Sequence, residues 1–168
     1  MPVEKVNALG KRDLRELTEA SQVAIRDGSG FGWDEAPTRQ VLERYWRGVL
    51  AVPTRTLFVA RLDKAICGSI QLVAPPPNKA MWSFTAEIDT HFVVPWGRGH
   101  GCAKELVEAA EAEARAEGFR VLNLSVPATQ SAAIKLYESL GYKRWGTLPR
   151  YARLKGEYVP GHYYTKDL

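Results

Sequence analysis

Residues 92–117 read F-V-V-P-W-G-R-G-H-G-C-A-K-E-L-V-E-A-A-E-A-E-A-R-A-E, which is the most informative pattern in the chain. An apolar strand ends at Val94 and Pro95, and a glycine-rich turn follows it. The spacing then predicts a helix to about Glu117, because its apolar residues share one helical stripe. These residues are Ala103, Leu106, Val107, Ala110 and Ala114. The charged residues predicted for the solvent face are Lys104, Glu105, Glu108, Glu111 and Arg115.

The turn before this helix is predicted to bind an anion. The amides of a helix's first turn lack intrahelical partners and lie at the positive end of the helix dipole. Gly99 and Gly101 have no side chain that would keep phosphate oxygens away from that backbone. The sequence therefore predicts a phosphate-binding strand, turn and helix.

Arg98 to Ala103 match the pattern R/Q-x-x-G-x-G/A. With the strand end Val93-Val94-Pro95, this turn resembles the GCN5-related N-acetyltransferase (GNAT) family, in which the motif holds the pyrophosphate of acetyl-CoA. Other phosphate motifs fit less well. A P-loop requires G-K-[ST] before its helix, and a dinucleotide-binding fingerprint requires a glycine where Cys102 stands.

Residues 130–142 read Q-S-A-A-I-K-L-Y-E-S-L-G-Y and resemble a second motif of this family, N-x-x-A-x-x-L-Y-x-x-x-G-F/Y. Ala133 and Tyr137 are one helical turn apart and share a face. In the family the matching tyrosine lies near the sulfur of acetyl-CoA and can protonate the departing thiolate, so the resemblance gives this role to Tyr137. The alternative is a core tyrosine with one hydrogen bond. Gln130 departs from the family's usual asparagine, which leaves its contact with the cofactor open.

The resemblance implies an α/β fold with a mixed, mostly antiparallel central sheet of about six to seven strands flanked by about four helices. We expect one acetyl-CoA-dependent N-acetyltransferase-like domain over residues 1–168 that moves the acetyl group directly to a primary amine of a small molecule or peptide. The alternative is a non-catalytic CoA-binding module for sensing or assembly. The cofactor-binding residues implied are His91, Phe92, Val93, Arg98, Gly99, His100, Gly101, Cys102, Ala103, Lys104, Gln130 and Tyr137.

Candidates for a catalytic base lie on the strand before the turn. An alkylammonium group has a pKa near 10, so a base must remove its proton at neutral pH. Glu87, Asp89 and His91 alternate onto one face of a regular strand. The other face would carry Ile88, Thr90 and Phe92. Glu87 is the first choice, because A-E-I resembles the position of the family's strand-borne glutamate. His91 is the second, because its ordinary pKa is near neutrality. A bulge would change which of them faces the cleft.

Hydrophobic spacing and turn residues predict the remaining elements. Further helices are expected over residues 11–27, 38–50 and 130–140, with Thr38 as an N-cap. Strands are expected over residues 3–9, 56–62, 65–73, 81–94, 120–126, 142–153 and 161–168. The loop over residues 27–33 carries Phe31 and Trp33, whose rings either line a binding surface or tuck under the loop. Trp82, Trp96 and Trp145 are expected to be packing residues.

Composition narrows the function further. The chain has 168 residues, a net charge of +4 and a pI of about 9.1, which suits an anionic cofactor. No block of Lys and Arg suggests nucleic acid, and no apolar run suggests a membrane span. The cysteines Cys67 and Cys102 show no metal or disulfide spacing, and Cys102 is expected to be inert. We therefore expect a cytoplasmic protein without a metal, and the sequence is compatible with a homodimer.

Overall fold

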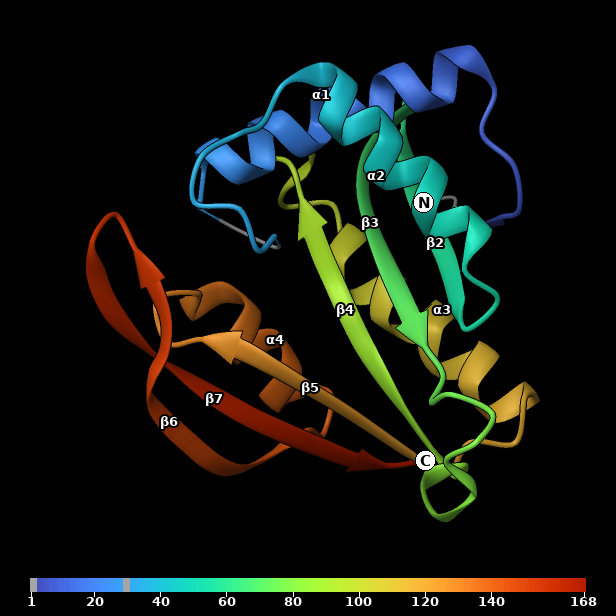
Figure 1. The fold of residues 1–168 in the computed structure, drawn as a ribbon, viewed down its shortest axis with the longest axis vertical. Coiled ribbons are helices and arrows are strands. Elements are labelled where there is room, and N and C mark those ends of the chain that lie inside the picture. The colour runs from blue at the N-terminus through green and yellow to red at the C-terminus, as the bar shows by residue number, and fades with distance from the viewer. Residues whose placement is uncertain (1–2, 29–30) are drawn as a thin grey trace.

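The computed structural model describes residues 3–28 and 31–168, and within them seven strands form one sheet in the order β1-β2-β3-β4-β5-β7-β6 (Figure 1). The strands are β1 (Val3–Val6), β2 (Arg55–Leu62), β3 (Ala65–Val73), β4 (Thr85–Val93), β5 (Val121–Pro127), β6 (Lys143–Leu154) and β7 (Glu157–Asp167). The helices are α1 (Lys11–Arg26), α2 (Arg39–Ala51), α3 (Cys102–Ala116) and α4 (Ser131–Ser139), with the short 3₁₀ helices η1 (Ala80–Trp82) and η2 (Pro95–Gly97).

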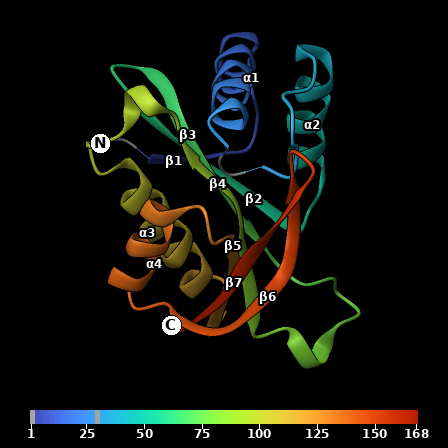
Figure 2. The ribbon, with the colours of Figure 1, turned by 90° about the vertical axis from the view of Figure 1, so that its left-hand side faces the viewer.

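The helices cover both faces of the sheet. Figure 2 shows α1 and α2 on one side and α3 and α4 on the other. Each long helix buries its apolar stripe against the strands: Leu17 and Ala24 of α1 and Leu106 and Val107 of α3 are fully buried. No helix in the described ranges is long and apolar enough to span a membrane. The expected mixed, mostly antiparallel sheet with helices on its faces is confirmed.

Local sequence signals placed most elements correctly. The turn between β2 and β3 has positive φ angles at both Asp63 and Lys64, and the side chain of Thr38 accepts a hydrogen bond from the amide of Val41. Three boundaries are wrong. Strand β1 ends at Val6 instead of residue 9. Met81 lies in η1 with 80% of its surface exposed, so β4 begins at Thr85 instead of residue 81, and β7 begins at residue 157 instead of 161. Residues 29 and 30 of the expected loop lie outside the described residues.

Strands β4 and β5 separate along their length. They pair in parallel only where Thr85–Glu87 meet Val121–Asn123. Beyond this point β4 follows β3 and β5 follows β7, so the two strands diverge (Figure 1). The edge of β4 that faces β5 therefore has backbone groups without a strand partner, and such groups require another hydrogen-bonding partner.

A β-bulge in β4 changes which of its side chains lie on each face of the sheet. Ser69 of β3 pairs with Phe92 of β4, and Gln71 of β3 pairs with Asp89 of β4. The one residue between Ser69 and Gln71 therefore lies opposite two residues of β4, Thr90 and His91. Thr90 adopts a φ of 49° at this point, and the Asp89 carboxylate accepts a hydrogen bond from its amide. The extra residue shifts the alternation of side chains. His91 therefore does not share a face with Glu87 and Asp89, and the expected common face of the three residues is wrong.

Glu111 was expected on the solvent face of α3, and this expectation is also wrong. Its side chain is buried, and its Oε2 atom accepts hydrogen bonds from the Tyr142 hydroxyl and from Lys166 Nζ, both at 2.8 Å. Glu111 thereby connects α3 to strand β7 and to the residue that precedes β6.

Replacing Glu111 with alanine is expected to lower the free energy of unfolding by about 3 kcal/mol, because the ammonium of Lys166 and the hydroxyl of Tyr142 lose their buried partner. Urea unfolding measures this change. Glu108→Ala is the matched control on the exposed side of α3, where an i, i+4 pair with Lys104 contributes at most about 0.5 kcal/mol. Equal effects of the two substitutions would contradict a structural role of Glu111.

Candidate active site

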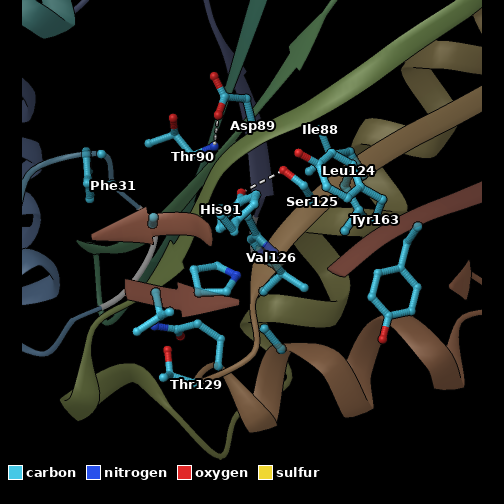
Figure 3. A pocket seen from close by; sticks show the side chains of 18 of the residues that line it. Phe31, Ile88, Asp89, Thr90, His91, Leu124, Ser125, Val126, Thr129 and Tyr163 are labelled. Atoms are coloured by element: carbon cyan, nitrogen blue, oxygen red, sulfur yellow. Dashed lines mark hydrogen bonds between the residues drawn. The ribbon is translucent and has the colours of Figure 1, made fainter. Parts of the chain in front are cut away.

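The separation of β4 and β5 opens a cavity of about 810 Å³. Its walls come from β4, β5, the start of α4, the loop after α1, and the β6–β7 hairpin. Figure 3 shows Asp89, Thr90 and His91 of β4 beside Leu124, Ser125 and Val126 of β5. Residues that are far apart in the sequence therefore line one cavity beside β4, the strand predicted to carry the catalytic base.

His91 and Tyr137 form a hydrogen-bonded pair in this cavity. The Nδ1 atom of His91 lies 2.7 Å from the hydroxyl oxygen of Tyr137, and both residues line the cavity. Because the bulge turns His91 toward α4, its partner is the predicted catalytic tyrosine and not the carboxylates of β4. Sequence reasoning named both residues but did not connect them.

Burial keeps both members of this pair neutral. It lowers the pKa of His91 to about 4, an effect that the nearby Ala103 backbone opposes. Burial also raises the pKa of Tyr137 above its ordinary value near 10. At neutral pH the imidazole is therefore uncharged and the tyrosine retains its proton.

The carboxylates of Glu87 and Asp89 line the cavity from the other side of β4, and they differ in their partners. Asp89 pairs with the guanidinium of Arg55 at 3.0 Å, and the same Arg55 nitrogen donates to Gln71 at 2.6 Å. The side chain of Glu87 is exposed and makes no hydrogen bond or ion pair with another described residue. Both side chains are exposed, that of Asp89 by 48%, and Glu87 is the one that has no charged partner among the described residues.

The turn that is predicted to bind an anion has open space beside its backbone. Gly99 and Gly101 have φ angles of +81° and +80°, which side chains rarely adopt, and a Cβ atom on either residue would meet nothing within 4 Å. Gly101 is the N-cap of α3, and as a glycine it has no side chain that could cap this helix end. His100 donates from Nδ1 to the carbonyl of Arg98 at 2.9 Å. Among the residues described, none from Arg98 to Lys104 lines the cavity.

Two further residues of the predicted cofactor set contact the end of α1. Arg98 forms an ion pair with Asp27, and the Gln130 amide donates to the carbonyl of Gly28. The side chain of Arg98 remains 50% exposed, so Asp27 does not shield it from a phosphate. Lys104 is exposed and lies 3.8 Å from Glu108.

The other predicted residues of this region pack in the interior. Phe92 is buried, and its ring centroid lies 5.0 Å from that of Phe31. Val93 pairs with Gly68 of β3. Cys102 is buried with its sulfur 3.4 Å from that of Cys67, whose pKa burial raises to about 12. The burial of Cys102 outside the cavity agrees with the expectation that this residue is inert. No group of metal-ligating side chains occurs in the described part of the chain.

Aromatic residues of the β6–β7 hairpin line the cavity, and sequence reasoning missed them. The ring of Tyr163 lies 5.3 Å from Trp145 and 5.9 Å from Tyr151, whose hydroxyl is 2.7 Å from Ser125 Oγ. Trp145 is 66% exposed, so its expected role in packing is wrong, and the equally expected packing roles of Trp82 and Trp96 are wrong for the same reason. The one signal available was the high aromatic content of residues 142–164.

Comparisons with known proteins agree with this architecture. A family model described as "Acetyltransferase (GNAT) family" matches residues 14–142. An uncharacterized N-acetyltransferase of Azospirillum brasilense is 52% identical over 128 residues, which are 76% of each chain.

Solved structures share the fold. A ribosomal-protein-alanine N-acetyltransferase from Brucella melitensis superposes with a TM-score of 0.83 at 18% identity and full coverage of both chains. A phosphinothricin acetyltransferase from Sinorhizobium meliloti, solved in complex with acetyl-CoA, gives 0.81 at 20% identity, over 100% of this chain and 89% of that one. The family match over most of the sequence, together with the identity to the Azospirillum protein, shows that the chain belongs to the GNAT family of acetyltransferases.

Proposed function

We propose that this acetyltransferase moves the acetyl group of acetyl-CoA to a primary amine of a small molecule or peptide, by direct transfer in the cavity between β4 and β5. The observation that carries the proposal is the cavity itself, in which Glu87 and Tyr137 both take part. Glu87 can serve as the base that takes a proton from the amine, and Tyr137 as the acid that gives a proton to the departing sulfur.

The open backbone at the end of β4 fits acetyl-CoA. Gly99 and Gly101 leave space before the N-terminus of α3, where backbone amides and the helix dipole favour phosphate. Arg98 adds an exposed positive charge beside this turn. The free edge of β4 beyond Glu87 offers hydrogen bonds to an extended amide chain. When bound, acetyl-CoA supplies an activated thioester, whose acyl group an amine can attack.

Glu87 is the best-placed base. Its carboxylate is exposed in the cavity, whereas Asp89 is held by Arg55 and by the amide of Thr90. His91 lies against Tyr137, and its pKa of about 4 makes it a weak acceptor of the amine's proton.

Tyr137 is the best-placed acid. Its raised pKa keeps the hydroxyl protonated throughout the physiological range. The neutral imidazole of His91 either donates to or accepts from this hydroxyl, and in both tautomers it fixes the oxygen's position. Tyr137 then holds a proton that it can give to the departing sulfur.

Purified protein, acetyl-CoA and a panel of primary amines test the function, with CoA thiol release as the readout and mass spectrometry of the acetylated amine as confirmation. We expect amine-dependent release. Acetyl-CoA binding without turnover on any amine would contradict the proposal and favour the non-catalytic CoA-binding module.

Glu87→Gln is expected to lower the transfer rate roughly 10²-fold or more on the acid side of neutrality, the usual contribution of a general base. At high pH the amine loses its proton unaided, so the loss should shrink there. The pH–rate profile of kcat/KM measures this. Asp89→Asn is the matched comparison on the same face of β4. A profile altered by Asp89→Asn and not by Glu87→Gln would assign the base to Asp89.

A further inference from the structure

We propose that the acceptor is a cationic amine that carries an apolar ring system and has no carboxylate beside the amine. This inference rests on the proposed acetyl transfer in the cavity between β4 and β5. It follows from two independent properties of the cavity wall, which are its charge and its aromatic side chains.

The charge of the cavity is opposite to that of the whole chain. The lining contains three carboxylates, from Asp34, Glu87 and Asp89, and within the described ranges Arg153 is its one permanent cation. This leaves a surplus of two negative charges among the lining residues, or of one when the Arg55 that pairs with Asp89 is counted, in a protein whose net charge is +4. Since the pKa of His91 is about 4, this residue adds no positive charge at neutral pH. A concave site lined by one sign of charge concentrates ligands of the opposite sign.

The carboxylates differ in how far neighbours neutralise them. Arg55 partly compensates Asp89, whereas Asp34 accepts hydrogen bonds from the backbone amide of Lys155, which is an uncharged donor. Glu87 has no such partner among the described residues. An ammonium group is therefore favoured near β4, whereas a carboxylate on the carbon next to the amine would meet the charge of Glu87.

Aromatic rings form two walls of the cavity. On the first wall, which the loop after α1 provides, Phe31 lies 6.1 Å from Trp33. The second wall consists of Trp145, Tyr151 and Tyr163 from the β6–β7 hairpin. Figure 3 shows Phe31 and Tyr163 on opposite sides of the view, with Asp89 and Thr90 between them.

Hydrogen bonds connect the two aromatic walls, which can enclose a flat ligand. Asp34 of the first wall binds the amide of Lys155 in the β6–β7 turn at 3.1 and 3.2 Å. Tyr151 is fixed by its hydroxyl contact with Ser125 and by close packing on Gly161, where a Cβ atom would lie 2.0 Å from its ring. Such preordered rings stabilise apolar bodies by stacking and ammonium groups by cation–π attraction.

The charge is tested with 2-phenylethylamine and phenylalanine, which differ only by the carboxylate. We expect kcat/KM to be at least about 30-fold higher for 2-phenylethylamine, the effect of two unit charges about 8 Å apart at an effective dielectric constant of about 20. In Glu87→Gln both rates fall with the loss of the base, but the ratio between the two amines should also narrow. An unchanged ratio would show that Glu87 does not set the charge preference.

The aromatic walls are tested with Trp145→Ala. Because Trp145 is largely exposed, this variant should fold normally, and the KM for 2-phenylethylamine should rise roughly 3- to 10-fold, whereas that for butylamine, which has no ring to stack, should rise less. Trp82→Ala is the control, since Trp82 is 52% exposed on η1 and does not line the cavity.

Three results would overturn the inference. These are equal or faster transfer to phenylalanine, equal KM changes for both amines in Trp145→Ala, and a higher kcat/KM for an alanyl tripeptide than for 2-phenylethylamine. Each of them leaves the proposed acetyl transfer intact. Absence of transfer to every amine, with acetyl-CoA still bound, would instead overturn the proposed function.

Discussion

Gly101→Glu is expected to lower the affinity for acetyl-CoA by orders of magnitude while the protein remains folded. The substitution places a carboxylate at the N-cap of α3, in the open space where phosphate oxygens would approach the backbone. The repulsion is electrostatic and is reinforced by the volume of the side chain. Since a Cβ at this position meets nothing within 4 Å, the cost to stability is that of a left-handed φ, about 1–2 kcal/mol. Isothermal titration calorimetry with CoA measures the affinity.

Two control variants separate charge from backbone strain. Gly118→Glu introduces the same side chain at the other end of α3, at a φ of +88° and also with nothing within 4 Å, and should leave CoA affinity unchanged. Gly101→Ala imposes the strain without the charge and should weaken binding far less than Gly101→Glu. Unchanged CoA affinity in Gly101→Glu would show that the turn does not hold the pyrophosphate.

The glycine-rich turn before α3 could be predicted from sequence because its determinants are local. The apolar spacing of α3 and the glycines before it depend on neighbours within a few residues, and the positive φ angles of Gly99 and Gly101 agree with that prediction. The same holds for the tight turn at Asp63 and Lys64.

The sequence could suggest that β4 contains a bulge, but it could not give the position of the bulge. Strand length suggested one, but no glycine marks its position, and Thr90 adopts its left-handed φ because the Asp89 carboxylate accepts from its amide and β3 fixes the register. Shifting the alternation by one residue moved His91 from the carboxylates to Tyr137. A local pattern therefore named residues that line the cavity but not the face of β4 on which each lies.

The aromatic wall of the cavity could not be predicted, because its contacts join distant parts of the chain. Tyr151 meets Ser125 on β5 and Gly161 on β7, and Asp34 meets Lys155 across 121 positions of sequence. The buried Glu111 is a similar case, since Lys166 lies 55 positions away. Helical periodicity cannot show that a charged residue has a buried partner on another element.

Tyr137→Phe is expected to lower the rate of acetyl transfer roughly 10²- to 10⁴-fold, the usual contribution of a general acid. Phenylalanine keeps the ring that packs in the core and removes only the hydroxyl, so CoA affinity should change little, and loss of the hydrogen bond to His91 should lower the free energy of unfolding by about 1–2 kcal/mol. Because burial raises the pKa of Tyr137, the hydroxyl is protonated on both sides of neutrality. The loss should therefore be constant with pH, in contrast to the loss in Glu87→Gln, and single-turnover rates at several pH values measure it.

Tyr142→Phe is the matched control for this variant. The two tyrosine rings lie 5.9 Å apart, but the hydroxyl of Tyr142 binds Glu111 and not the cavity partner His91. Its removal should lower the melting temperature and leave the transfer rate unchanged. A Tyr137→Phe protein that transfers at the full rate would mean that the thiolate departs without a proton from this side chain. The pair of Tyr137 with His91 would then serve only to fill the core between β4 and α4.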